Sequence, residues 1–399
     1  MNSVFGCDIL VLKSLKKGLK ETDKLTFLLC LILSAIGVVM VASTTHRTLA
    51  DGEWISRDAK VMILALILGT VACLVISYID YDLIFKLWPV VVAASLFLMF
   101  LLFTPLAVSP QGREDATSWL KITNKLYFQP SEILKIAFII TFSYHLGKVK
   151  NNISSIKNVV LLCAHAAIPI LLVVKTGDMG SALIFMLMFI GMMFAAGLHW
   201  LYFPAGLLAI AAVSPIVWYK VFDNIQRNRI LALINPEAYP TEIYQQQHAV
   251  VAMQEGGFFG TGLFKGPYTQ SDYVPEIQND MIFSAICEEA GFVGAFILLL
   301  LFLLLAIRII KVGKLSHNFS ALMLCYGVMF MIAAQVVVNV GMCTMLLPVI
   351  GITLPFISAG GSSTICLYLA IGLVLSVYRS SQGIDYDDYR YARIARRYD

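Results

Sequence analysis

Charged side chains are scarce in this sequence of 399 residues, where they make up only 14% of the chain. Soluble domains contain about 25% charged residues, so the composition excludes an ordinary soluble domain. Hydrophobic residues make up 59% of the chain, and the mean hydropathy is +0.80. Apolar runs of about 20 residues recur, which is the length of a membrane-spanning helix. These runs lack the alternation of membrane β-strands, so the sequence predicts an all-α polytopic membrane protein.

Several patterns that carry chemistry are also missing. The 8 cysteines form no C-x-x-C pair and the 6 histidines are far apart, so no metal-site spacing is present. No G-x-S-x-G segment occurs, and a serine hydrolase is therefore not indicated. The formal net charge is only +4, and no basic patch carries interleaved aromatic residues. We therefore expect no nucleic acid partner, and we interpret the cysteines as small core residues.

About ten apolar ranges predict membrane-spanning helices. They are residues 26–44, 60–79, 84–106, 132–147, 158–175, 180–198, 200–219, 281–310, 318–340 and 360–379. Ten spans place both chain ends on one side, and basic residues such as Lys148 and Arg308 near the expected inner ends indicate that this side is the cytoplasm. The chain then divides into a cytoplasmic N-terminal segment (1–24), a single transmembrane domain (25–380) and a cytoplasmic tail (381–399).

Three further segments are expected on the outer side. Residues 108–130 form the first, and residues 220–280 form a long extracellular loop between the seventh and eighth helices. A connection of that length is usually functional. The third segment, residues 341–361, is apolar but is interrupted by prolines and glycines. Because irregular backbone at membrane depth survives only inside protein or beside a water-filled cavity, we predict a re-entrant wall of a cavity open to the outside.

Three carboxylates mark the start of the eighth predicted helix. Asp280 directly precedes the apolar run, where it fits both a helix cap and a general base at the edge of a cavity. Glu288 and Glu289 fall inside apolar sequence, where an ionised carboxylate costs roughly 3 kcal/mol. Eight residues of helix place Glu288 about 12 Å deeper than Asp280, beyond the roughly 5 to 9.5 Å of a glycosidase carboxyl pair. We therefore interpret Glu288 and Glu289 as structural polar residues bonded to neighbouring helices.

Other charged residues are candidates for a binding site. Glu132 and Lys135 are three residues apart and lie on one helix face, where they form an ion pair or line the site. Asp178 fits the cap of the sixth helix. The long loop contains three basic residues that either form a solvated surface or hold a diphosphate, for which arginine is well suited: Arg227, Arg229 and Lys265. Trp119, in the first outer segment, is a further substrate-binding candidate. The glycine-rich run at 255–266 matches no P-loop spacing.

An ordered set of motifs resembles one known family. The motifs are FQPSEILK at 128–135, GDMGSA at 177–182, a run at 235–263 that begins NPEAYPTEIYQQQH, VPEIQNDMIFSAICEEAGFVG at 274–294, and LPVIGITLPFISAGGSS at 347–363. Together they are similar to the SEDS family, which includes RodA, FtsW and SpoVE. The functional aspartate of that family corresponds to Asp280, and its Q-P-S-E-x-x-K pattern corresponds to residues 129–135.

This resemblance implies a function in cell wall synthesis. It implies a peptidoglycan glycosyltransferase in the bacterial cytoplasmic membrane, surrounded by membrane lipids, that polymerises lipid II on the outer face. The implied partner is a class B penicillin-binding protein that acts as transpeptidase. The chain departs from the family pattern at five positions, with Ser118 for arginine, Gly177 for proline, Asn279 for threonine, Met281 for phenylalanine and Ala359 for tyrosine. Elongation, division and sporulation are not distinguished by these motifs.

The resemblance gives an expected mechanism and two alternatives. Asp280 would take the proton from an acceptor sugar hydroxyl, and undecaprenyl diphosphate would leave with inversion, stabilised by Lys135, Arg227, Arg229 or Lys265. A divalent cation, Mg²⁺ or Mn²⁺, is a candidate cofactor for the diphosphate. The first alternative is a lipid II flippase, since intramembrane charges and a broken helix also suit transport. The second is a non-catalytic scaffold for the penicillin-binding protein.

Overall fold

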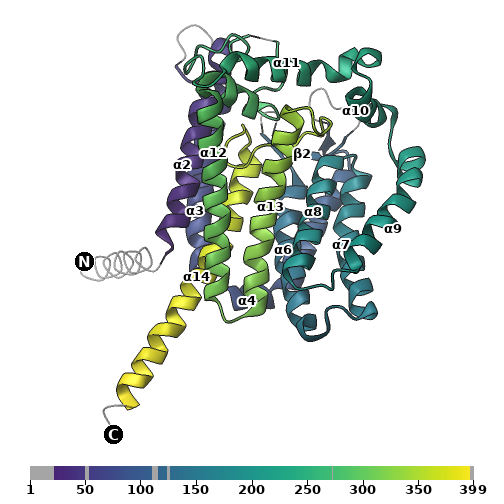
Figure 1. Ribbon diagram of the computed structural model, residues 1–399. Helices are drawn as coiled ribbons and strands as arrows, with labels where there is room; N and C mark the ends of the chain where they lie inside the picture. The colour runs from purple at the N-terminus through teal and green to yellow at the C-terminus, as the bar shows by residue number, and fades with distance from the viewer. Residues whose placement is uncertain (1–21, 50–53, 110–115, 124–125, 272, 396–399) are drawn as a thin grey trace, which may run out of the picture.

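The chain folds into a bundle of helices with one small sheet at its end (Figure 1). This computed structural model describes residues 22–49, 54–109, 116–123, 126–271 and 273–395, with side chains as far as Gln382. Residues 1–21 of the predicted cytoplasmic N-terminal segment and residues 396–399 of the predicted cytoplasmic tail lie outside this part. Helix α14 begins at Gly361 and continues through Ala395, so it extends beyond the bundle (Figure 1).

Within the described ranges, seven helices are long and apolar enough to cross a membrane. They are α2 (Lys24–Thr44), α3 (Arg57–Tyr78), α7 (Ile156–Lys175), α9 with the turn that follows it (Tyr202–Val221), α12 (Ile282–Leu315), α13 (Phe319–Cys343) and the first part of α14 (Gly361–Gln382). Two shorter apolar stretches are α5 with its following turn (Trp88–Phe103) and α8 (Met179–Ala195). Helix α6 (Pro130–Val149) adds 20 residues. The protein is an all-α polytopic membrane protein, as predicted.

Helices occupy most of each range that the sequence analysis assigned to a span, and one of these ranges is divided between two helices. The predicted third span divides into α4 (Tyr81–Lys86) and α5 (Trp88–Phe100). The break falls at Leu87, and Pro89 follows in the first turn of α5. Proline has no backbone N–H and is tolerated in a first turn. A new helix therefore starts there, and α4 becomes a short connector at the end of the bundle opposite α11 (Figure 1).

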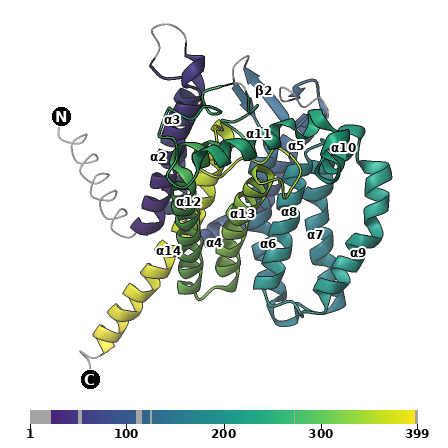
Figure 2. The same cartoon turned by 45° about the horizontal axis from the view of Figure 1, so that its top comes forward.

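Two outer segments contain more regular structure than a loop. The long outer segment, residues 220–280, contains α10 (Asn224–Ile234) and α11 (Pro240–Gly256). The first outer segment forms an antiparallel sheet in the order β1-β2-β3, made of β1 (Ala107–Val108), β2 (Trp119–Thr123) and β3 (Leu126–Phe128). Strand β3 leads directly into α6 through Gln129. The sheet, α10 and α11 all lie at one end of the bundle (Figures 1 and 2).

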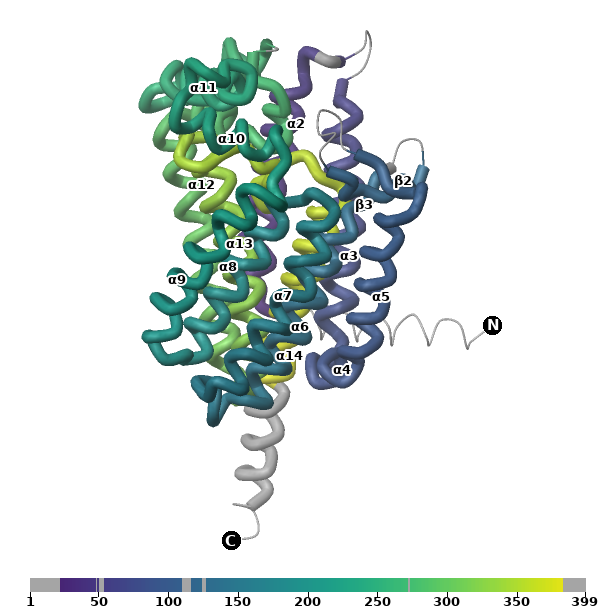
Figure 3. The backbone as a smooth tube through the Cα atoms, turned by 90° about the vertical axis from the view of Figure 1, so that its right-hand side faces the viewer, coloured from purple at the N-terminus to yellow at the C-terminus, as the bar shows by residue number. Residues whose placement is uncertain are grey.

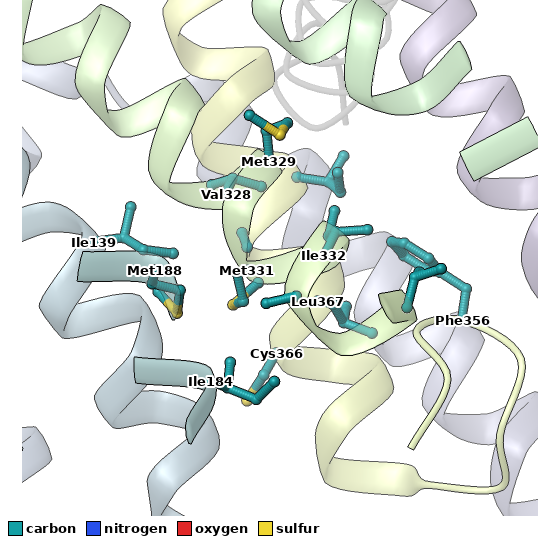
Figure 4. Close-up of a cluster of buried hydrophobic side chains, with 14 of the residues drawn as sticks. Ile139, Ile184, Met188, Val328, Met329, Met331, Ile332, Phe356, Cys366 and Leu367 are labelled. Carbon is teal, nitrogen blue, oxygen red and sulfur yellow. The ribbon is translucent and has the colours of Figure 1, made fainter. Parts of the chain in front are cut away.

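Helix α13 is the centre of the bundle and packs against α6, α8, α12 and α14. Its buried residues Val328, Met331 and Ile332 belong to one apolar cluster with Ile184 of α8 and Leu367 of α14 (Figure 4). At the other extreme, α9 (Tyr202–Ile216) buries none of its residues. It lies at the opposite edge of the bundle from α5 (Figure 3).

Small residues allow α3 and α14 to approach closely. A Cβ atom on Gly69 would lie 3.1 Å from the Cβ of Tyr368, and one on Gly372 would lie 2.8 Å from the carbonyl oxygen of Cys73. Close van der Waals packing of this kind is a main source of helix association inside a membrane. Lipid tails are as apolar as the side chains, so the hydrophobic effect does not drive helices together there. The Tyr368 hydroxyl lies 3.0 Å from the Ser34 hydroxyl, which ties α2 to the same pair of helices.

Helix α12 is interrupted near its start, and the glycine-rich run fills the gap. Gly291 has φ 68° and ψ −172° inside the helix, a region that is open essentially only to glycine. The amides of Thr261 and Gly262 donate to the carbonyls of Glu288 (2.9 Å) and Glu289 (3.0 Å). In return, the amide of Phe292 donates to the Gly257 carbonyl at 3.0 Å. The glycine-rich run is therefore a structural partner of the broken helix.

The Gly291→Ala variant is expected to be strongly destabilised. A Cβ atom there would lie 2.3 Å from the Gly260 nitrogen, and the backbone angles are unfavourable for alanine. Together these effects are expected to lower the free energy of unfolding by about 3 kcal/mol or more. Thermal unfolding in detergent measures this effect. Gly206→Ala is the matched control, because nothing lies within 4 Å of its added Cβ, and equal melting temperatures for the two variants would contradict the expectation.

Candidate active site

A pocket of about 370 Å³ lies at the end of the bundle that carries the sheet, α10 and α11. Its wall is built by α6, α8, α10, α11, α13, α14 and β2 together with the loops between them. One loop is the irregular segment, residues 344–360, between α13 and α14. It contributes Val349, Gly351, Ile352, Thr353, Ala359 and Gly360 to the pocket. The expected cavity wall is thus formed by the interrupted apolar segment that the sequence indicated.

Asp280 lines this pocket and is half-buried, but it is not a helix cap. Helix α12 begins at Ile282, its N-cap residue is Met281, and no side chain caps it. The predicted capping role of Asp280 is therefore wrong. The turn before the helix places this carboxylate on the pocket wall instead of over the first helical amides.

The backbone around Asp280 is held by hydrogen bonds from α13 and the irregular segment. Asn339 Nδ2 donates to the carbonyl of Asp280 and to that of Ile352, both at 2.8 Å. The Ser358 hydroxyl donates to the Asn279 carbonyl at 2.7 Å. Asn339 and Ser358 were missed by sequence reasoning. The available signal was an asparagine inside an apolar helix, since a buried polar side chain needs a partner.

The pair predicted on α6 is formed and also lines the pocket. Lys135 Nζ lies 2.8 Å from Glu132 Oε1. Lys135 is 1% exposed and Glu132 is 6% exposed, yet both contribute to the pocket wall. The two residues therefore form an ion pair and also line the pocket, so both interpretations left open by the sequence apply. A buried ion pair is held in one geometry by its mutual hydrogen bond, so the ammonium has a fixed position beside the cavity.

Asp178 is the helix cap that the sequence predicted. It precedes α8 and accepts a hydrogen bond from the Ser181 amide at 2.9 Å. It also accepts one from Gln129 Nε2 at 2.8 Å, which joins the start of α8 to the start of α6. Gln129, Asp178 and Ser181 all line the pocket.

The basic candidates of the long outer segment separate into two groups. Arg229 lines the pocket, as does Trp119 of β2. Arg227 does not line the pocket. Its guanidinium donates to the carbonyls of Trp218 (2.8 Å) and Phe222 (2.7 Å), which lie in and directly after the turn that follows α9. Residues two apart on a helix do not share a face, which explains why only one of the two arginines reaches the cavity. Lys265 is exposed and lies off the pocket wall.

Glu288 and Glu289 are structural, although the partner predicted for Glu288 was wrong. Glu288 is fully buried and accepts hydrogen bonds from the amides of Tyr268 and Thr269, both at 2.7 Å. Its partners belong to the long outer segment and not to a neighbouring helix. Glu289 accepts a hydrogen bond from the Ser43 hydroxyl of α2 at 2.6 Å. Glu288 therefore anchors the segment that leads to Asp280, and Glu289 connects α12 to α2.

Three of the positions that depart from the family pattern, Ser118, Asn279 and Ala359, line the pocket. Gly177 does not, but it has φ 77°. Proline requires φ near −65°, so the turn before Asp178 is incompatible with the proline of the pattern. This departure is accommodated by the local backbone conformation.

Among the described residues, no group of three or more His, Cys, Asp or Glu side chains could hold a metal ion. A magnesium ion, however, commonly keeps several waters and binds through one or two carboxylates plus substrate phosphates. Asp280 and Glu276 both line the pocket. The carboxylates present therefore fit a cation that arrives with a phosphate-bearing ligand, but not a permanent metal centre.

The chain is similar in sequence to one family of known proteins. Residues 23–383 match the model of the FtsW/RodA/SpoVE family, described as cell cycle protein. The chain is 32% identical to the probable peptidoglycan glycosyltransferase FtsW of Geobacter sulfurreducens, with 92% of this chain and 98% of the relative covered. It is also 32% identical to the peptidoglycan glycosyltransferase MrdB of Escherichia coli K12, with 66% of this chain and 71% of the relative covered.

Two solved structures have the same fold. One comes from work described as "Structural coordination of polymerization and crosslinking by a peptidoglycan synthase complex", with a TM-score of 0.75, 26% identity, and coverage of 90% of this chain and 98% of that one. The other is the rod shape determining protein RodA of Thermus thermophilus, with a TM-score of 0.66, 24% identity, and coverage of 90% and 97%.

Proposed function

Because this chain belongs to the FtsW/RodA/SpoVE family and its relatives are peptidoglycan glycosyltransferases, we propose that it polymerises lipid II at the outer face of the cytoplasmic membrane. The observation that carries this proposal is the pocket itself. It combines one half-buried carboxylate, Asp280, with the cations Lys135 and Arg229. That combination supplies a base and charge stabilisation in one cavity of a membrane protein.

Asp280 is the general base in this proposal. Its carboxylate takes the proton of the acceptor sugar 4-hydroxyl, and the hydroxyl oxygen then attacks the anomeric carbon of the donor chain. The bond from that carbon to the diphosphate breaks, undecaprenyl diphosphate leaves, and the anomeric configuration inverts. The leaving group is already a good one, so a base and stabilisation of negative charge suffice.

Lys135 and Arg229 are the groups proposed to bind the diphosphate. Arginine presents a planar set of donors that matches phosphate oxygens, and lysine acts as a compact charge. A divalent cation would neutralise part of the diphosphate charge when bound, and the carboxylates of Glu276 and Asp280 on the pocket wall would hold it. Neither Arg227 nor Lys265 lines the pocket, and the Arg227 guanidinium is bound to the Trp218 carbonyl. Both observations argue against a role in diphosphate binding.

Arg229→Gln is expected to raise the KM for lipid II about tenfold, because a hydrogen bond to a charged group contributes about 1.5–3 kcal/mol. Steady-state polymerisation by the purified protein measures the change. Lys265→Gln is the matched control, since it removes the same charge from an exposed position off the pocket. An increase of similar size for both variants would indicate a general effect of charge rather than a contact in the pocket.

The proposal also includes the orientation of the protein in the membrane and its partner protein. We propose that both chain ends are cytoplasmic, in agreement with the basic residues at the inner connections. The similarity to a chain studied in a complex that coordinates polymerization and crosslinking supports a class B penicillin-binding protein as the crosslinking partner. Apolar helix faces such as that of the unburied α9 would contact membrane lipids and the lipid tail of the substrate.

A lipid II flippase is the competing function, because a pocket with intramembrane charges also suits transport. Purified protein in detergent, incubated with labelled lipid II, separates the two. A glycosyltransferase is expected to form polymer without a bilayer, whereas a flippase forms no bond there. Absence of polymer from the folded protein, alone and with the crosslinking partner added, would contradict the proposed function. A non-catalytic scaffold would likewise form none.

A further inference from the structure

Gln335, on α13, has a hydrogen-bonding atom that the protein leaves unused. Its side chain is on the wall of the pocket, and the residue is 3% exposed. Among the described residues, Oε1 of Gln335 has no hydrogen-bond partner. Buried polar atoms in folded proteins are nearly always paired, and an unpaired one is unfavourable. A group that enters the pocket would therefore supply the missing partner.

The position of Gln335 relates it to the proposed base. It lies four residues before Asn339, whose Nδ2 holds the Asp280 carbonyl at 2.8 Å. Residues four apart share a helix face, and four residues of helix correspond to about 6 Å. The Gln335 amide therefore lies about one helical turn deeper than the asparagine that positions Asp280. Gln335 and Asp280 line the same pocket.

Other unpaired atoms do not share this arrangement. Asn339 Oδ1 is also without a partner among the described residues, but the Nδ2 of that amide donates to two carbonyls. That amide is therefore fixed, and Asn339 is not part of the pocket wall. Among the described residues, Ser143 Oγ is unpaired as well, but Ser143 lies off the pocket. Gln335 alone among these three lines the cavity.

We propose that Gln335 binds an acetamido group of the lipid-linked sugar and so selects N-acetylated sugars. A neutral amide offers an acceptor oxygen and donor hydrogens, and an acetamido group offers the complementary N–H and carbonyl. The Gln335 amide can turn by 180° without changing its shape, so either of its atoms can face the ligand. Phosphate and carboxylate groups are better bound by Lys135 and Arg229. This inference rests on the proposed function, since the acetamido sugars belong to lipid II.

The test is a binding measurement that needs no turnover. Full-length protein in detergent is titrated with fluorescently labelled lipid II and with a synthetic analogue that has hydroxyl groups in place of both acetamido groups. Wild-type protein is expected to bind lipid II about tenfold more tightly than the analogue. In Gln335→Met, which keeps the length of the side chain but removes the amide, the affinity for lipid II is expected to fall about tenfold, while the affinity for the analogue changes less than twofold.

Gln247→Met is the matched control, because Gln247 is exposed on α11 and off the pocket. Equal losses for both ligands in Gln335→Met would assign Gln335 to packing and overturn its role in selection. The same conclusion follows if wild-type protein binds the two ligands equally, a comparison that does not depend on the folding of any variant. Wild-type protein that binds neither ligand would overturn the proposed function and this inference with it.

Discussion

Asp280→Asn is expected to reduce lipid II polymerisation by about a hundredfold or more. Asparagine has nearly the same shape as aspartate but cannot accept a proton at neutral pH, and a positioned general base typically contributes about 10² to 10⁴ in rate. The fold around this residue is expected to persist, because Asn339 holds it through its main-chain carbonyl at 2.8 Å. The substitution leaves that carbonyl in place.

Polymer length and yield from labelled lipid II, with purified protein in detergent, measure this effect. Glu255→Gln is the matched control, since it neutralises an exposed carboxylate on α11 away from the pocket. The melting temperatures of both variants should stay close to that of the wild type. A folded Asp280→Asn variant with wild-type polymer yield would remove Asp280 from the role of base and favour a positioning role.

Lys135→Met is expected to lower both stability and activity. Removing the ammonium leaves the Glu132 carboxylate buried without its partner at 2.8 Å, and breaking a buried ion pair costs about 3–5 kcal/mol. Thermal unfolding in detergent is expected to show this loss. The activity of the single variant is not informative by itself, because a lower fraction of folded protein would also reduce polymer yield.

The double variant Glu132→Gln with Lys135→Met separates the two effects. It removes both charges, so most of the lost stability is expected to return, since apolar or neutral replacements of a buried pair are often tolerated. If Lys135 stabilises the leaving diphosphate, the folded double variant should still polymerise about a hundredfold more slowly than wild type. Recovery of full activity together with stability would show that the ion pair is only structural.

Much of the architecture followed from the sequence because hydrophobicity acts locally. A run of about 20 apolar residues has to satisfy its own backbone hydrogen bonds in lipid, and a helix achieves this within the run itself. Helices accordingly occupy the expected ranges. The Glu132–Lys135 pair and the Asp178 cap also depend on spacings of three residues within one helix, and both were predicted.

Features that depend on contacts between distant segments were not predicted. The cap expected at Asp280 is absent because the backbone before α12 is held by Asn339 and Ser358, which lie 59 and 79 residues from the carbonyls that they bind. Glu288 is paired with the amides of Tyr268 and Thr269, which spacing along a helix could not indicate. Likewise, Arg227 and Arg229 are two arginines of the same helix, and the sequence does not show which of them reaches the pocket. The packing of α10 places Arg229 there.

Hydrophobicity and residue spacing along the chain were enough to predict the class of protein, the positions of the helices and the residue types available for chemistry. These depend on the transfer of side chains and backbone between water and lipid, which each segment experiences alone. Which polar groups share one cavity, and that Gln335 Oε1 is unpaired there among the described residues, became known from the folded arrangement. Those outcomes depend on how α6, α8, α13 and the irregular segment pack together, and no single segment contains that information.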